Sequence, residues 1–290
     1  MKGPVDIWIG QVESTWLELL NNHVQHLFSN TFLPSHDHTH HRRVWNNCRK
    51  ILKAQSKDYP ELDLSLVEGV IIAAFFHDTG MVRSTGMEHG PLGKEICRSF
   101  FSEREKRKHL APPVRFPEIL VAIEKHDSKD QQIYRGIQPD KSPDILGMLS
   151  VADDLEAMGT IGIYRYSEIY LKRGISMKDL GVCVLKNSAE RYRNISRGCN
   201  FCTDLRKEFR QKYDNLVSFY DMYNQQLLAT PSPEDTFTGH IGVINLIRIL
   251  SVEGTTRPEN FLEQTGPVSR SSVVTGYFTE LNNELEKTAG

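Results

Sequence analysis

Histidine and aspartate, which can bind metal ions or transfer protons, recur in this chain on segments that are otherwise apolar. The stretch HDHTHH at residues 36–41 alone holds four of the eleven histidines. A histidine followed by an aspartate ends a long apolar run, and single imidazoles or carboxylates follow on three later segments. The residues singled out by position are His40, His77, Asp78, His89, His126 and Asp153.

The spacing of apolar residues predicts that helices turn these side chains inward. Counted from His40, positions +4 and +8 are Val44 and Cys48, so His40 shares the apolar face of an amphipathic helix. The run 62–81, LDLSLVEGVIIAAFFHDTGM, is apolar on nearly every side and is expected to cross the centre of the fold. A buried carboxylate and imidazole need a partner there, and a metal cation supplies one.

The pattern from residue 6 to about 223 has helical periodicity almost throughout and no run of alternation long enough for a sheet. It predicts an all-α fold, a helical bundle. Taken singly, each inward histidine is more often a hydrogen-bonded core residue than a ligand, but five helices presenting one argue for a shared site. Helices are expected to begin at Asp6, Ser35 to Asp37, Asp63, Glu88, Pro117, Pro143 and Ser188.

Length and composition limit the broader alternatives. The 290 residues suffice for a large core, and the net charge of -2 directs the protein toward neither nucleic acid nor an anionic membrane. The longest apolar run, residues 70–76, is far below the roughly 20 residues of a membrane span, so a soluble, cytoplasmic protein is expected. The five cysteines are expected to be ordinary thiols, although Cys199 and Cys202 form a C-x-x-C that half a zinc site would also explain.

A segment with two prolines, ATPSPEDTFTG at 229–239, suggests a division of the chain. Residues 1–230 are predicted to form the main domain. Residues 231–290 are predicted to form a small helical extension that docks on this core or at an oligomer interface, because they are too few for a core of their own.

Five motifs stand out along the chain: HDHTHHRRVW at 36–45, FFHDTG at 75–80, EHGPLGKE at 88–95, IEKHD at 123–127 and SVADDLEAMGTIGIYR at 150–165. Together, over roughly residues 30 to 200, they resemble the successive signatures of the HD superfamily of metal-dependent phosphohydrolases. Within it the sequence is most similar to uncharacterised bacterial HD hydrolases. Such relatives often carry a second aspartate where Val151 stands and a basic residue where Asp154 stands.

The resemblance implies an all-α HD-domain fold with two divalent transition-metal ions, Mn, Fe, Co, Ni or Zn. It implies that His77 and Asp78 carry catalysis, with Asp78 bridging the ions. His36 and Asp37 are expected to cap their helix or to support a ligand from behind, and His38 and His41 to face solvent or the cleft mouth. The metal ligands that the resemblance implies are His40, His77, Asp78, His89, His126 and Asp153.

The reaction expected first is hydrolysis of a phosphomonoester or phosphodiester bond, in a nucleotide or another small phosphorylated molecule, by a metal-activated hydroxide. Two alternatives stay open: a diiron oxygenase of the same fold and a non-catalytic, metal-containing nucleotide sensor. No membrane or nucleic-acid partner is expected, and a homo-oligomer is left open. The cations considered for substrate binding are Arg43, Arg83, Lys94, Lys125, Lys129 and Arg165.

Overall fold

The computed structural model describes residues 3–56, 62–106, 111–128, 144–198, 203–265 and 269–289, and no β-strand occurs among them. The all-α class is therefore confirmed. The α-helices are α1 (Pro4–Val12), α2 (Glu18–Leu27), α3 (His38–Gln55), α4 (Leu64–Phe76), α5 (His89–Lys106), α6 (Phe116–Lys125), α7 (Ile145–Glu156), α8 (Gly159–Lys172), α9 (Met177–Gly198), α10 (Thr203–Ala229), α11 (Gly239–Ile247), α12 (Phe261–Thr265) and α13 (Ser272–Ala289). Shorter 3-10 and π segments are η1 (Glu13–Leu17), η2 (Phe28–Asn30), η3 (Thr79–Val82), η5 (Pro233–Asp235), η6 (Arg248–Val252) and η7 (Pro258–Asn260).

The chain forms two compact units, each built from segments that are distant in sequence. Unit 1 comprises Met1–Thr31, His36–Leu155 and Arg193–Arg206. Unit 2 comprises Phe32–Ser35, Glu156–Tyr192 and Lys207–Gly290. The predicted division into a main domain, residues 1–230, and an extension, residues 231–290, stays a prediction.

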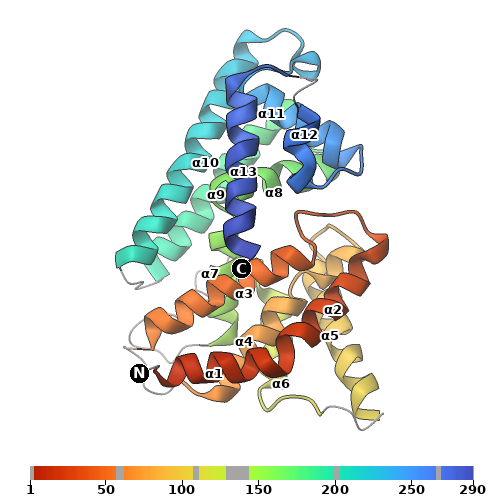
Figure 1. Ribbon diagram of the computed structural model, residues 1–290, viewed down its shortest axis with the longest axis vertical. Coiled ribbons are helices and arrows are strands. Elements are labelled where there is room, and N and C mark those ends of the chain that lie inside the picture. The colour runs from red at the N-terminus through yellow and green to blue at the C-terminus, as the bar shows by residue number, and fades with distance from the viewer. Residues whose placement is uncertain are drawn as a thin grey trace. The chain divides into compact units, whose positions relative to one another are not determined.

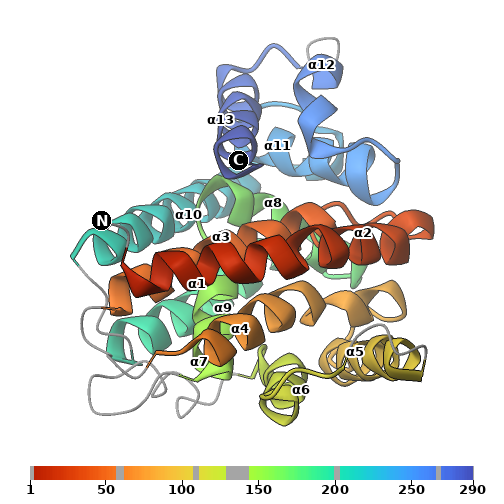
Figure 2. The same ribbon diagram turned by 60° about the horizontal axis from the view of Figure 1, so that its bottom comes forward.

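Helix α4 is the centre of unit 1, because ten of its residues are buried and it is apolar on all sides. It contacts α1, α2, α3, α5 and α6, and α1, α3 and α4 run nearly side by side (Figures 1 and 2). Asp63 starts the helix by accepting the Leu66 N–H at 2.7 Å. The segment Leu64–Val82 is apolar and long enough to cross a membrane, but 83% of its most apolar window is buried inside the protein, as in a core helix.

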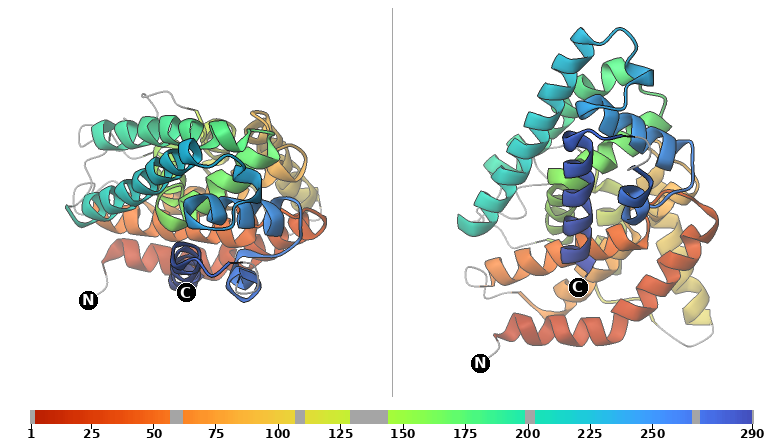
Figure 3. Two further views of the ribbon diagram at one scale, coloured as in Figure 1. Left: turned by 90° about the horizontal axis from the view of Figure 1, so that it is seen from above. Right: turned by 45° about the horizontal axis from the view of Figure 1, so that its top comes forward.

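Unit 2 is organised around α8, whose residues Gly159 to Ile169 are all buried. Helices α11 and α13 pack on α8 and on each other (Figure 3), and their apolar residues Ile244, Phe278 and Leu281 are buried. The helix start expected at Ser188 is wrong, because this residue lies inside α9. Its hydroxyl donates to the Leu185 carbonyl of its own helix at 3.2 Å, as mid-helix serines do, and caps nothing.

Two of the cysteines, Cys48 and Cys97, are free thiols in the core of unit 1. Burial raises the pKa of both thiols, which keeps them protonated and inert. The pair Cys199 and Cys202 lies outside the described residues.

Candidate metal centre

The first group of candidate ligands comes from α3, the end of α4 and α7. His40 Nε2 lies 3.1 Å from His77 Nε2 and 3.7 Å from Asp153 Oδ1. Together with Asp78, these residues offer one ligand atom each, all within 4.8 Å of one another. Helix α7 is tied to α3 beside this group, because the Asn47 amide donates to the Ala152 carbonyl at 3.1 Å.

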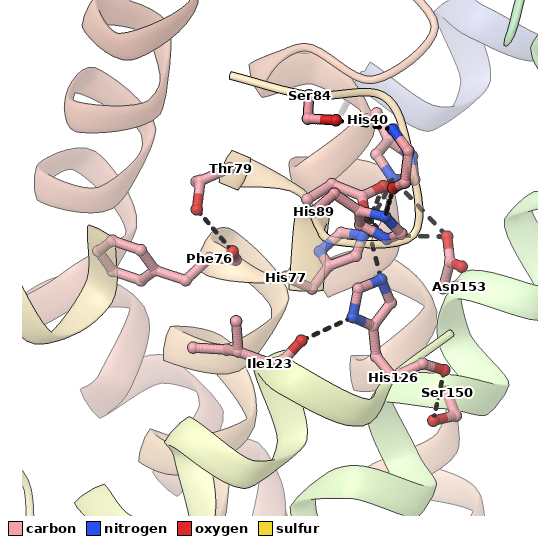
Figure 4. A network of polar contacts seen from close by, with 12 residues as sticks. His40, Phe76, His77, Thr79, Ser84, His89, Ile123, His126, Ser150 and Asp153 are labelled. Carbon is pink, nitrogen blue, oxygen red and sulfur yellow. Dashed lines mark hydrogen bonds and ion pairs between the residues drawn. The ribbon is translucent and has the colours of Figure 1, made fainter. Parts of the chain in front are cut away.

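The second group shares Asp78 and adds one histidine from each of two other helices. His89 is the first residue of α5 and His126 follows the last residue of α6. Asp78 Oδ1 lies 3.1 Å from His126 Nε2 and 3.5 Å from His89 Nε2. The Ser150 hydroxyl of α7 donates to the His126 carbonyl at 3.1 Å and holds this end of α6 (Figure 4).

The Asp78 carboxylate stands between the two groups. Its Oδ2 lies 3.4 Å from His40 Nε2 and 3.3 Å from His77 Nε2, whereas its Oδ1 faces His89 and His126. Each oxygen of one carboxylate therefore belongs to a different cluster. This is the arrangement that a carboxylate shared between two cations requires.

Three of the four histidines use the same backbone device to aim Nε2 at the centre. The Nδ1–H groups of His77, His89 and His126 point at carbonyls three residues earlier, at 2.9, 2.7 and 2.8 Å. This assigns the proton to Nδ1 and leaves the Nε2 lone pair facing Asp78, as in metal-binding histidines. The accepting carbonyls belong to Ala74, Gly86 and Ile123.

The donor set fits divalent metal ions. All six residues are at most 5% exposed, and four imidazoles with two carboxylates suit transition metals better than Mg²⁺ or Ca²⁺. His40 Nε2 and His77 Nε2 face each other at 3.1 Å although the proton of His77 is committed to Nδ1, and a cation placed near them would accept both lone pairs. The structure thus brings together every residue predicted as a ligand, and these groups can bind metal ions.

Two glycines allow α5 to come close enough for His89 to reach Asp78. A Cβ on Gly80 of η3 would lie 1.9 Å from the His89 carbonyl oxygen, which no side chain tolerates. A Cβ on Gly90 would lie 2.6 Å from the Glu124 carbonyl oxygen of α6. Glycine at both positions therefore permits the close packing of η3, α5 and α6 that assembles the second group.

The electrostatics of the centre hold Asp78 ionised. Burial by itself would raise the pKa of this carboxyl, but the His77 ring beside it and hydrogen bonds from His126 and His40 keep the pKa well below its usual value. Burial would likewise lower the pKa of His126, yet its hydrogen bond to Asp78 and the negative charges of Asp78, Asp153 and Asp127 together outweigh burial and raise that pKa to about 9. Without metal, His126 and Asp78 therefore form a buried ion pair.

Three residues at the start of α3, His36, Asp37 and His41, are buried beside the candidate ligands. Asp37 is the N-cap and accepts the Thr39 N–H at 2.9 Å, and His36 is buried with its ring 5.3 Å from that of His40. The expectation that His41 faces solvent or a cleft mouth is wrong. Its ring is fully buried, 4.9 Å from the His77 ring and 5.9 Å from the Phe28 ring, because α4 and η2 cover this side of α3.

The cations considered for substrate binding lie in different surroundings. Arg43 is buried and donates to the Thr39 hydroxyl at 3.1 Å, while Arg83 is exposed with Nη1 3.8 Å from Glu95 Oε2. Lys94 Nζ donates to Glu124 Oε2 at 2.8 Å. Arg165 is a buried residue of α8 in unit 2, and Lys129 lies outside the described residues. Contact with a substrate stays a prediction for each of them.

Comparison with known protein families agrees with this geometry. Residues 38–158 match the family model described as HD domain, and this segment contains all six residues of the centre. The chain contains an HD domain. Neither a curated protein nor a solved structure matches the chain significantly.

The resemblance seen in the motifs is thereby confirmed, and the buried histidines and aspartates are consistent with an HD metal site. HD domains are mostly metal-dependent phosphohydrolases, so the match over residues 38–158 suggests metal-dependent hydrolase activity in general. Sequence reasoning overlooked the residues that support this HD domain's ligands. Ser84 lies outside the quoted motifs. His41 and Ser150 lie within them, but only the fold shows that the His41 ring packs beside His77 and that Ser150 donates to the His126 carbonyl.

Proposed function

We propose that this chain is a phosphohydrolase that holds two divalent transition-metal ions and cleaves a phosphomonoester or phosphodiester bond in a nucleotide or another small phosphorylated molecule. The observation that carries the proposal is the placement of Asp78, with one carboxylate oxygen toward each cluster. One ion would be held by His40, His77, Asp78 and Asp153. The other would be held by His89, His126 and Asp78.

The chemistry that such a pair supplies is acidification of water and neutralisation of charge on the phosphoryl group. The protein's own groups prepare the site for it. Asp78 stays a carboxylate at every physiological pH because its pKa is held low. The Nδ1–H bonds of His77, His89 and His126 keep three rings oriented, so that no reorientation is needed when the substrate arrives.

A cavity beside the second cluster is the space that we assign to a small substrate. It has a volume of about 230 Å³, and its polar lining comprises His89, Glu124, Lys125, His126, Asp127 and Ser128. This volume is near the lower end of ligand sites, and it fits a phosphoryl group with its nearest neighbours better than an extended ligand. Lys125 is exposed at the cavity and places a positive charge there, so it is the cation we assign to substrate binding.

The experiment that tests the function is phosphate release from a panel of nucleotides and cyclic and linear phosphodiesters. Metal-stripped protein is reloaded separately with Mn, Fe, Co, Ni or Zn, and Asp78→Ala is assayed alongside. Asp63→Ala is the control, because it also removes an aspartate carboxylate at one end of α4 in unit 1, but at the exposed N-terminal end, away from the clusters. We expect metal-dependent turnover that Asp78→Ala abolishes and Asp63→Ala retains.

If a folded protein that binds two ions releases phosphate from none of these compounds, the proposed hydrolase activity is refuted. The same protein would then be loaded with Fe²⁺ and its oxygen uptake followed with the same compounds. Uptake without phosphate release would indicate the diiron oxygenase, and nucleotide binding without either reaction would indicate a sensor.

A further inference from the structure

The three histidines that donate through Nδ1 differ in what holds the accepting carbonyl. Ala74 lies inside α4 and Ile123 inside α6, so the helices themselves fix the carbonyls that orient His77 and His126. Gly86 lies in the turn between η3 and α5, where no regular helix positions its carbonyl. His89 is therefore the one of these three whose orientation depends on a turn.

The side chain of Ser84 organises that turn. Its oxygen accepts the Gly86 N–H at 3.1 Å, and its hydroxyl donates to Glu88 Oε1 at 2.6 Å. The Gly86 carbonyl then receives both the Nδ1–H of His89 at 2.7 Å and the His89 backbone N–H at 3.3 Å. Ser84 thus bonds both to Gly86, whose carbonyl accepts from His89, and to Glu88, which directly precedes His89.

Backbone bonds anchor both ends of the turn: at its end, the His89 N–H donates to the Gly86 carbonyl and the Leu92 N–H to the Glu88 carbonyl. The N–H groups of Arg83 and Ser84 both donate to the Gly80 carbonyl, at 2.9 and 3.1 Å. Between these ends, the Ser84 hydroxyl adds a bond from the Gly86 N–H and a bond to the Glu88 carboxylate. Ser84 is half-buried and contacts neither a candidate ligand nor the cavity directly, so any effect on the metal centre acts through Gly86.

We infer that Ser84 is a positioning residue that sets the affinity of the second metal ion by fixing the carbonyl that orients His89. The inference rests on the proposed two-metal function. Partners that orient a ligand histidine typically change metal affinity about 10- to 100-fold when they are removed. Ser84 acts one step behind such a partner, so the lower figure applies. The first ion, held by His40, His77, Asp78 and Asp153, should be unaffected by its loss.

The test measures bound cobalt on the metal-stripped full-length protein, by equilibrium dialysis against Co²⁺ with metal analysis and by the visible absorption of the bound ion. Ser84→Ala removes the hydroxyl, and Ser84→Thr restores it. Ser176→Ala is the matched control, because Ser176 also donates to a carboxylate, Asp179 Oδ2 at 2.6 Å, and accepts a backbone N–H, but at the start of α9 in unit 2.

We expect two ions in the wild-type protein and in Ser176→Ala, and a second ion bound about 10-fold more weakly in Ser84→Ala. Ser84→Thr should return the second affinity and its absorption band to the wild-type values. Unchanged binding in Ser84→Ala overturns the inference, as does equal weakening of both ions or equal weakening in Ser176→Ala. A wild-type protein that takes up fewer than two ions overturns both the inference and the dinuclear function. Two bound ions without phosphate release contradict the function alone.

Discussion

Replacing Gly80 by alanine should dismantle the second cluster while leaving the first in place. The added Cβ would lie 1.9 Å from the His89 carbonyl oxygen and 2.8 Å from the Gly93 nitrogen, whereas real Cβ contacts essentially never fall below 3.0 Å. The start of α5 must therefore retreat by about 1 Å. Metal–ligand distances tolerate about 0.2 Å, so a displacement of that size removes His89 from the ligand set.

Two quantities follow from this displacement. The second ion should be lost at free metal concentrations that saturate the wild-type protein, and turnover should fall at least about 100-fold, as expected for an ångström of misplacement. The free energy of unfolding should fall by about 1–3 kcal/mol, the usual cost of forcing an extra carbon into a packed region. Cobalt stoichiometry, phosphate release and urea unfolding measure the three effects.

Gly10 provides the matched control for this substitution. It lies in α1 of the same unit, and a Cβ there would meet nothing within 4 Å. Gly10→Ala should keep both ions and stabilise the fold by about 0.5–1 kcal/mol, because alanine is the better helix former. A folded Gly80→Ala protein with two ions and near wild-type turnover would refute the argument that this close approach builds the site.

Three further outcomes are expected. Burial, with a smaller contribution from Arg104, lowers the pKa of His23 to about 4, so the unfolded chain takes up a proton between pH 6.5 and 4 that the folded protein excludes. The urea midpoint of the metal-free protein should therefore decrease as the pH is lowered from 7 to 5, and it should decrease less in His23→Phe. An equal decrease in the midpoint of both proteins would contradict this. Asp37→Ala should cost about 1 kcal/mol in urea unfolding by removing the cap of α3, and Asp37→Asn much less. Chelation of the metal should leave the circular dichroism spectrum helical. The midpoint of thermal unfolding should decrease with the logarithm of the free metal concentration. Loss of helicity on chelation would show instead that the metal is required for folding.

Local pattern was a sound guide wherever one face of a helix decides burial. The stripe that runs from His40 through Val44 and Cys48 is buried as its spacing predicts. The apolar run before His77 forms the central helix, because a segment without a polar face can lie only in the core. In both cases burial depends on the hydrophobicity of the side chains and on their spacing along the helix.

The same reasoning failed where neighbours distant in sequence decide the outcome. His41 falls beside the apolar stripe of α3, and whether it meets water depends on Phe28 and His77, which come from other elements. Ser188 is a good capping residue in isolation, but α9 continues through it. Neither position could be assigned without knowing which segments pack against it.

The amino-acid sequence by itself determined the helical class, the central helix and the residue types that meet at the centre. These follow from periodicity, hydrophobicity and ligand chemistry, which are local. Only the tertiary structure decided that the two Asp78 oxygens face different clusters, that Gly80 admits His89, and that Ser84 holds the turn behind it. Those relations depend on ångström-scale approaches between elements far apart in the chain, and such distances are set by packing.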